Sequence, residues 1–335
     1  MRFPIPAALI ALAAVPTSLS AAPQPIPVPP GLPPAVSNGA FRMGADALWG
    51  AGITGDGQTV AILDVGFAGL DDAIAADELP PRSALTIRSF DPANGIDGRN
   101  PVGEATGHGV RMAEIVHDVA PDARLLLVNY NTQAQFRQAV AWTVAQGARV
   151  VSHSNSFLTP PFDGTGPNAR SVDAAAGAGV LWVNSAGNFA QRHWSGEIGA
   201  DPVLLDVDSG AADPLAFAVA RTGGAGALSF TLERRAGDGS WQGIETVDVG
   251  DAGVLSAIRP AGSDRWRVRL SAEGGPVTAR LFSRTAGFGP AGVASGSIPT
   301  PGDAAGSLSA AAVPWTGDAI APYSSLGPTL DGRSK

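Results

Sequence analysis

Short, nearly unbroken apolar runs alternate with helical segments along the first half of this 335-residue chain. The runs are residues 59–63 (TVAIL), 124–128 (RLLLV), 149–151 (RVV) and 180–183 (VLWV). Strands without a polar face are typical of a parallel sheet that is covered by helices on both sides. This pattern predicts an α/β domain whose first part covers residues 39–196.

The segments between these runs carry helix signals. Thr132 and Gln135 have the spacing of a capping box, and Gly147 supplies a stop for the helix that follows. Residues 171–178 form a second, shorter candidate helix that ends before Gly179. One helix is therefore expected between the apolar runs at 124–128 and 149–151, and another between those at 149–151 and 180–183.

The hydrophobic pattern changes in the second half of the chain. Apolar residues there alternate with polar ones, as in Leu228, Phe230 and Leu232. Period-two alternation in short segments is typical of antiparallel strands with one face in water. We therefore expect residues 197–298 to form an inserted β-sandwich-like or jelly-roll-like module, and residues 299–335 to return to the α/β domain.

Charge and cysteine content exclude several classes of function. The chain has 22 Lys and Arg against 30 Asp and Glu, which gives a formal net charge of −8. An acidic chain without a basic run does not favour nucleic acid as a partner. The absence of cysteine removes disulfide scaffolds, thiolate nucleophiles and cysteine-ligated metals.

The N-terminal residues resemble an export segment. Arg2 precedes an apolar run over residues 7–15, and small residues follow it, so residues 1–22 are predicted to be a signal peptide. The run is shorter than the roughly 20 residues that span a bilayer, so no membrane span is expected. Residues 23–38 are rich in proline and form a predicted linker. A secreted or periplasmic location follows.

Three polar residues lie where the α/β pattern would place ligand-handling groups. Asp64 follows the first apolar run, His108 opens a candidate helix, and Asn188 follows the fourth run. In open α/β sheets such groups collect beyond the carboxyl ends of the strands. An aspartate, a histidine and a side-chain amide are three of the four parts of serine acyl transfer. Taken singly, Asp64 could be a turn residue and His108 a capping histidine.

Four segments together resemble the motifs of the subtilisin-like serine peptidases, the subtilases. They cover about residues 40–190 and 305–335, and they occur in the order of the family's aspartate motif, histidine motif, oxyanion-asparagine motif and approach to the serine motif. In this sequence they read GQTVAILDVGFAGLDD, GHGVRMAEIVHDVAPDARL, GVLWVNSAGN and IAPYSSLGPTLDGRSK. The resemblance implies a subtilisin-like parallel sheet with helices on both faces, interrupted by the antiparallel module, and a serine endopeptidase that acts on polypeptides.

The resemblance also implies roles for individual residues. Asp64 would orient the imidazole of His108, which would act as general base and then as acid. Asn188 would donate a hydrogen bond to the tetrahedral oxyanion. Ser154, Asn155 and Ser156 lie in the segment that resembles the substrate-pairing strand.

The chain departs from the family pattern at single positions near these motifs. Val65 replaces the usual serine or threonine, and Val110 replaces the usual threonine. Ser156 stands where glycine is common, and there it is expected to crowd the first specificity pocket.

The family's serine motif, Gly-Thr-Ser-x-Ala-x-Pro, is absent from residues 1–335. Ser307 and Ser309 lie before the SSLGP stretch, so their place in the order argues against a nucleophilic role. We therefore expect a sequence truncated before the serine motif, and a chain that is inactive as given and lacks a helix of the family's core. The alternative is a secreted, non-catalytic relic whose β module binds a glycan or protein surface, which an exposed cluster of Trp241 and Trp266 would favour.

No cofactor is expected to be required. His117 lies half a turn out of phase with His108, and His153 is predicted to be structural. His193 is predicted to pack beside Trp194, with a substrate contact as the alternative. The histidine spacing does not fit a zinc site, so no metal site is predicted. The loop over residues 91–100 contains Asp91, Asn94 and Asp97 and could hold a structural calcium, but its spacing is not that of a calcium loop, which favours a solvated turn. The sequence does not indicate an oligomeric state.

Overall fold

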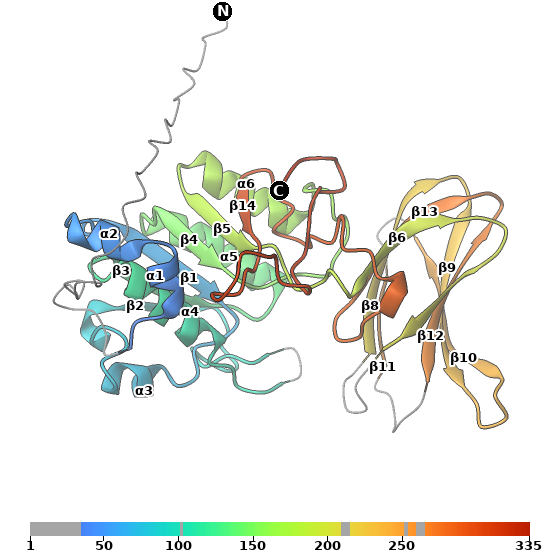
Figure 1. Ribbon diagram of the computed structural model, residues 1–335, viewed down its shortest axis with the longest axis horizontal. Coiled ribbons are helices and arrows are strands. Elements are labelled where there is room, and N and C mark those ends of the chain that lie inside the picture. The colour runs from blue at the N-terminus through green and yellow to red at the C-terminus, as the bar shows by residue number, and fades with distance from the viewer. Residues whose placement is uncertain (1–34, 101–102, 209–214, 251–253, 259–264) are drawn as a thin grey trace, which may run out of the picture.

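The computed structural model describes residues 35–100, 103–208, 215–250, 254–258 and 265–335. It divides into an α/β unit and a β-sandwich beside it (Figure 1). The predicted signal peptide, residues 1–22, and most of the predicted linker, residues 23–38, lie outside the described residues.

A six-stranded sheet forms the centre of the α/β unit, in the order β14-β5-β4-β1-β3-β2, and all of its neighbouring pairs are parallel. The strands are β1 (Thr59–Asp64), β2 (Thr86–Ser89), β3 (Arg124–Asn129), β4 (Val150–His153), β5 (Leu181–Ser185) and β14 (Ser307–Ala310). The four apolar runs of the sequence all lie in this sheet. The predicted α/β fold with a parallel sheet is confirmed.

Helices cover both faces of this sheet. They are α1 (Asn38–Arg42), α2 (Ala45–Gly50), α3 (Leu70–Ala75), α4 (His108–Val119), α5 (Gln133–Ala145) and α6 (Pro167–Gly177), with short 3-10 turns at Arg82–Ala84 and Gly289–Ala291. The predicted capping box of Thr132 and Gln135 is present at the start of α5. The second predicted helix begins earlier than residue 171, because Pro167 is compatible with a first helical turn. Within the described part of the chain, no helix is long and apolar enough to cross a membrane.

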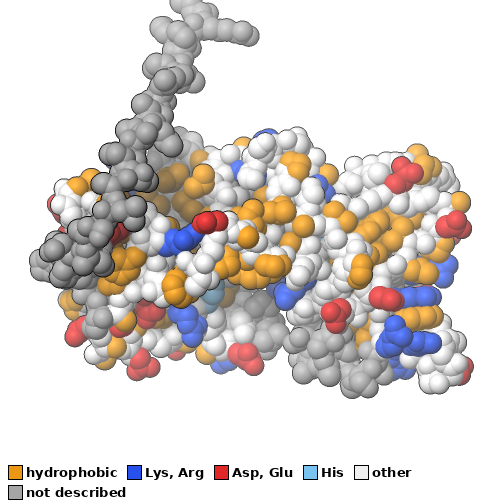
Figure 2. Space-filling view, viewed as in Figure 1, with side chains coloured by type: hydrophobic (Ala, Val, Ile, Leu, Met, Phe, Trp, Pro, Cys, Tyr) orange, Lys and Arg blue, Asp and Glu red, His pale blue; other side chains and the backbone are white. Residues whose placement is uncertain are grey.

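The two faces of the sheet are covered to different extents. Helices α5 and α6 pack along one face, against side chains from β1, β3, β4 and β5. Helices α3 and α4 cover the other face above β1 and β3, with contacts to Ile87 of β2 and Val150 of β4. Beyond them, Leu181 of β5 is 53% exposed and Leu308 of β14 is 58% exposed. Figure 2 shows hydrophobic side chains gathered on the surface of this part of the molecule.

Two antiparallel four-stranded sheets form the β-sandwich, in the orders β10-β9-β12-β7 and β11-β8-β13-β6. The strands are β6 (His193–Ile198), β7 (Val203–Val207), β8 (Leu215–Gly224), β9 (Ala227–Arg235), β10 (Trp241–Val249), β11 (Val254–Ile258), β12 (Trp266–Glu273) and β13 (Val277–Ser283). Strand β6 begins four residues before the predicted boundary at 197.

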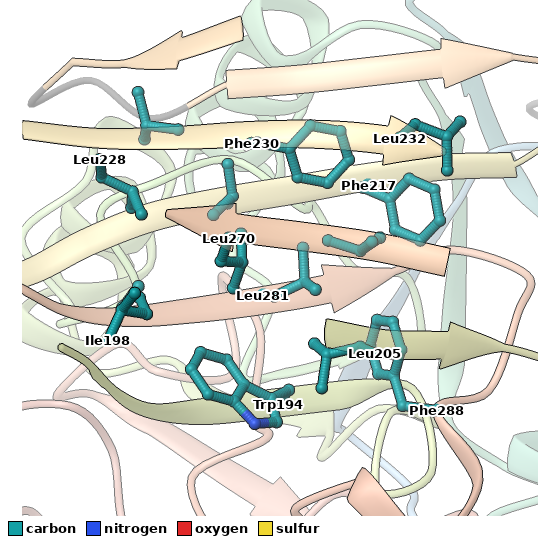
Figure 3. Packing of buried hydrophobic residues seen from close by; sticks show 14 of the residues in the cluster. Trp194, Ile198, Leu205, Phe217, Leu228, Phe230, Leu232, Leu270, Leu281 and Phe288 are labelled. Carbon is teal, nitrogen blue, oxygen red and sulfur yellow. The ribbon is translucent and has the colours of Figure 1, made fainter. Parts of the chain in front are cut away.

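The inner faces of the sandwich form one apolar core (Figure 3). Phe230 and Leu232 of β9 meet Phe217 of β8 within this core, as the alternating pattern predicts. Trp266 is only 4% exposed and belongs to the same core. Trp241 is half-buried, and the guanidinium of Arg267 lies 4.2 Å from its ring centroid. These two tryptophans therefore do not form an exposed aromatic cluster.

Candidate active site

Asp64 and His108 meet at the carboxyl-terminal edge of the parallel sheet. Asp64 is the last residue of β1 and is fully buried, and His108 is the first residue of α4. The Nδ1 atom of His108 lies 2.6 Å from Oδ2 of Asp64. A carboxylate only accepts hydrogen bonds, so Nδ1 carries the proton and the other ring nitrogen, Nε2, keeps its lone pair. The imidazole is half-exposed, with 47% of its side chain open to solvent.

Glycines allow α4 to approach the end of β1. A Cβ atom on Gly109 would lie 2.6 Å from the carbonyl oxygen of Gly66 and 2.9 Å from Cβ of Asp64. The backbone N–H of Gly109 instead donates to that carbonyl at 3.0 Å. The start of the helix is thereby held against the Asp64 turn, which fixes the distance between the carboxylate and the imidazole.

The Asp64 carboxylate accepts further hydrogen bonds. Its Oδ1 accepts from the backbone N–H of Val65 at 2.8 Å. Its Oδ2, already bound to His108, also accepts from Nδ2 of Asn155 at 3.0 Å. The sequence pattern did not predict this contact, because it assigned Asn155 only to the substrate-pairing segment. The only sequence signal for this contact is that Asn155 follows β4, which lies beside β1 in the sheet.

The bond to Asp64 changes the protonation of His108. It raises the pKa of His108 above 6.5, and burial and Arg111 oppose this effect. The charged imidazolium is thus stabilised by the carboxylate behind it. A histidine held in this way can take a proton at Nε2 and keep the resulting charge.

Asn188 lies in the loop that follows β5, where its side chain is exposed. Gly187 precedes it at φ +97°, a conformation that favours glycine. The segment around Ser325 holds both sides of this loop: its backbone N–H donates to the carbonyl of Gly187 at 2.8 Å, and its Oγ accepts from the N–H of Phe189 at 3.0 Å. Ser325 belongs to the SSLGP stretch that the sequence singled out, although its bonding partners were not predictable.

Two neighbouring pockets share the residues of this edge. Ser154, Ser185, Gly187 and Asn188 line both. One pocket, of about 410 Å³, is also lined by Asn155 and Ser156. The structure therefore brings all three residues of the predicted substrate-pairing segment to the cavity that holds Asn188.

The second pocket, of about 270 Å³, lies between α4 and the uncovered half of the sheet. Met112 of α4, Val183 of β5 and residues 310–312 contribute to its lining. It adjoins the exposed apolar surface of β5 and β14. This half of the site thus has an apolar wall.

A buried polar network lies behind the site. His153 is 1% exposed, its Nδ1 donates to Oδ1 of Asn184 at 2.6 Å, and its Nε2 accepts from the hydroxyl of Tyr130 at 2.6 Å. The indole N–H of Trp182 donates to the same Asn184 oxygen at 3.3 Å. Burial lowers the pKa of His153 to about 4, so this ring is neutral and uses both nitrogens. His153 has the structural environment that the sequence predicted for it.

The other histidines lie outside this edge of the sheet. His117 is buried in the last turn of α4, and burial lowers its pKa. Nδ1 of His193 donates to the carbonyl of Val293 at 2.7 Å, and burial lowers its pKa to about 4. Across the described residues, no three His, Asp or Glu side chains form a group that could hold a metal ion.

No described serine hydroxyl is hydrogen-bonded to His108. Within the described ranges its hydrogen bonds are to Asp64 and, through its backbone N–H, to Thr106, and none is to a serine. Ser307 and Ser309 lie in β14, the edge strand of the sheet, and the Oγ of Ser309 donates to the carbonyl of Gly302 at 2.8 Å. Neither serine is bonded to a histidine.

Comparison with known proteins places this chain in a family. Residues 55–335 match the sequence profile of the Subtilase family, Peptidase_S8. The chain is 29% identical over 177 residues to the Minor extracellular protease Vpr of Bacillus subtilis (strain 168), which covers 48% of this chain and 21% of that protein. The fold is similar to that of the Clostridium perfringens CspB protease, with a TM-score of 0.58, 14% identity, and coverage of 87% of this chain and 77% of that one. The chain spans about a fifth of the length of Vpr. It belongs to the subtilase family.

Proposed function

We propose that this chain is part of an exported subtilase endopeptidase. In it Asp64 orients His108, His108 moves the proton, and Asn188 donates to the oxyanion. The single observation that carries the proposal is the 2.6 Å bond between His108 Nδ1 and the buried Asp64 carboxylate. That bond leaves Nε2 as the proton acceptor on a half-exposed ring, which is the form that a general base requires.

We also propose that the nucleophilic serine is not among residues 1–335 and that these residues alone do not hydrolyse peptides. Two observations support this. No serine is hydrogen-bonded to His108 in the described part of the chain. The apolar half-face that carries Leu181 and Leu308 is uncovered beside the pocket that Met112 lines. A serine-bearing helix that packs there would bury this surface and approach the imidazole.

The β-sandwich does not favour the alternative of a glycan-binding or protein-binding relic. Trp266 is in the core, and Trp241 lies under Arg267. A flat aromatic platform is therefore missing from the two positions that would supply it. Retention of the Asp64–His108 pair further supports a peptidase, because a binding module has no use for a polarised imidazole.

Export is proposed on the composition of residues 1–22, and the similarity to a protease described as extracellular supports it. N-terminal sequencing of the protein from culture fluid or periplasm should find a start near Pro23. Recovery of intact Met1 from the cytosol would contradict export.

The proposed activity is tested by producing the protein from its gene with the DNA that follows the Lys335 codon read through in each frame. We expect the frame that supplies the family's serine motif to hydrolyse unfolded casein and to react with a fluorophosphonate at that serine. His108→Ala should abolish both, because it removes the base that activates the hydroxyl.

The matched controls are residues 1–335 alone and the His117→Ala variant of the extended chain. The short chain should show neither hydrolysis nor labelling, and His117→Ala should remain active. A fluorophosphonate adduct on any serine of residues 1–335 that depends on His108 would show that the nucleophile was wrongly placed. Equal hydrolysis by the parent and His108→Ala would remove His108 from the mechanism.

A further inference from the structure

The larger pocket of the site has walls from two loops of the α/β unit. Residues 154–157 form one wall, and residues 187–189 form the other. Its volume of about 410 Å³ lies within the range of small-ligand sites. Asn155, in the first wall, is bonded to Asp64, so the pocket adjoins the proposed catalytic pair directly.

The charged side chains that line this pocket are all cationic. They are Arg99, Arg192 and Arg284, and no Asp or Glu is among the lining residues. This arrangement is unexpected in a chain whose formal net charge is −8. The charged groups in the wall of this pocket are therefore cationic, and the buried Asp64 carboxylate lies behind Asn155.

Arg284 is the most informative of the three. Its side chain is partly buried, and it forms no ion pair within 4.0 Å with any described residue. Burial lowers the pKa of its guanidinium, and no neighbouring charge contributes to that shift. A partly desolvated guanidinium that has no counter-ion among the described residues is costly, and an anion that enters the pocket would lower that cost.

Arg192 and Arg284 are held in place at the base of the β-sandwich. Arg192 immediately precedes β6, Arg284 immediately follows β13, and these two strands pair with each other. The Arg192 guanidinium donates to the carbonyl of Arg284 at 3.1 Å, and the carbonyl of Arg192 accepts from the N–H of Ser283 at 2.8 Å. Closure of the inserted module thus brings both cations to the pocket of the α/β unit.

We infer that this pocket accepts the carboxylate side chain of a glutamate or aspartate in the bound polypeptide, with Arg284 and Arg192 as its partners. Guanidinium groups bind carboxylates through paired, charge-assisted hydrogen bonds. Phe157 and Phe189 supply apolar surface for the methylene groups of such a side chain. The inference rests on the proposed peptidase function, and it assigns the inserted module a part in substrate selection.

Binding to residues 1–335 tests this inference without any hydrolysis. Four capped peptides are titrated by NMR: acetyl-Ala-Ala-Pro-Glu-amide, its Gln and Lys counterparts, and the Gln peptide with a free C-terminal carboxylate. We expect the Glu amide to bind roughly tenfold to hundredfold more tightly than the Gln amide, the range for a hydrogen bond to a charged group. The difference should shrink at high salt, because the pocket is partly open to solvent.

Arg284→Gln should abolish the preference for Glu over Gln. Arg269→Gln removes the same charge on the outer face of the sandwich, where the side chain is 43% exposed, and should leave the preference intact. Should Arg284→Gln fail to fold, as judged by circular dichroism, the comparison of Glu and Gln peptides on the parent chain still decides the question.

Equal binding of the Glu and Gln amides would overturn the inference and leave the peptidase proposal standing. Tightest binding by the peptide with a free C-terminal carboxylate would also overturn it, in favour of a site for chain termini. Failure of every peptide to bind would overturn it as well. Conversely, a Glu preference in residues 1–335, together with no casein hydrolysis by any extended chain, would retain the pocket for an acidic side chain and reject the peptidase proposal.

Discussion

Asn155 and His108 are bound to the same oxygen of Asp64. Oδ2 accepts from His108 Nδ1 at 2.6 Å and from Asn155 Nδ2 at 3.0 Å. Asn155 also lines the pocket in which a substrate is proposed to lie. The same side chain therefore touches both the carboxylate that polarises the base and the cavity next to it, so a change at Asn155 should be detectable at His108.

We predict that Asn155→Ala raises the pKa of His108 further above 6.5. Loss of the amide donor leaves more negative charge on Oδ2, and this charge favours the imidazolium. The measurement is an NMR titration of the His108 ring proton in residues 1–335. Asn188→Ala is the control, because Asn188 lines the same pocket without a hydrogen bond to Asp64 among the described residues. An unchanged His108 titration in Asn155→Ala would mean that Asn155 does not tune the pair.

We predict that His153 and His193 reduce stability in acid. Both have a folded-state pKa of about 4, against 6.5 when unfolded, so the unfolded chain binds more protons between these values. The stability that each neutral ring contributes is present above pH 6.5 and is lost as the pH falls toward 4, by roughly 1.4 kcal/mol per pH unit per group. His193→Leu should flatten this slope in urea unfolding. An unaltered slope would show that His193 does not titrate in this way.

The carboxyl of Asp303 should change the pH dependence of stability in the direction opposite to that of His153 and His193. This carboxyl is fully buried, accepts from Gly164 N–H at 3.0 Å and Thr300 Oγ1 at 2.9 Å, and burial raises its pKa to about 6. The folded state therefore binds more protons than the unfolded state between pH 3.8 and 6, and stability falls as the pH rises through that window. Asp303→Asn should remove this loss, so that the free energy of unfolding falls less between pH 4 and pH 7 in the variant than in the parent. Asp331→Asn is the comparison variant: hydrogen bonds from Arg333 and Thr329 lower the pKa of Asp331 to about 2, so its loss should change the pH profile in the opposite direction. Identical pH profiles for the parent and Asp303→Asn would contradict the shift.

Ser325→Ala should loosen the loop that carries Asn188. Its Oγ is the acceptor for the N–H of Phe189, and an unsatisfied backbone donor costs about 1–3 kcal/mol. We expect lower thermal stability and faster amide exchange at Phe189. Ser324→Ala removes a similar bond, to the N–H of Ala312, and should leave the Phe189 amide protected. Equal protection of Phe189 in both variants would mean that Ser325 does not hold the loop.

The strands and their edge could be predicted from sequence because they depend on local composition. Apolar runs such as residues 59–63 are buried on both faces, and Asp64 and His108 follow from strand and helix boundaries. The contact of Asn155 with Asp64 could not be predicted, because it depends on the path of an irregular loop. The pairing of Arg192 with Arg284 depends on closure of a module about 90 residues long, which leaves no local pattern.

The position of β14 has a consequence for the order in which the chain folds. This strand completes the edge of the parallel sheet beside β5, yet the ribosome makes the whole sandwich between the two. Pairing of His193 with Phe282 brings the ends of the sandwich together, and each halving of the effective loop between β5 and β14 lowers its closure cost by roughly 0.6 kcal/mol. A sandwich that folds first thus shortens the effective loop between β5 and β14, which lowers the entropic cost of pairing these two strands during synthesis.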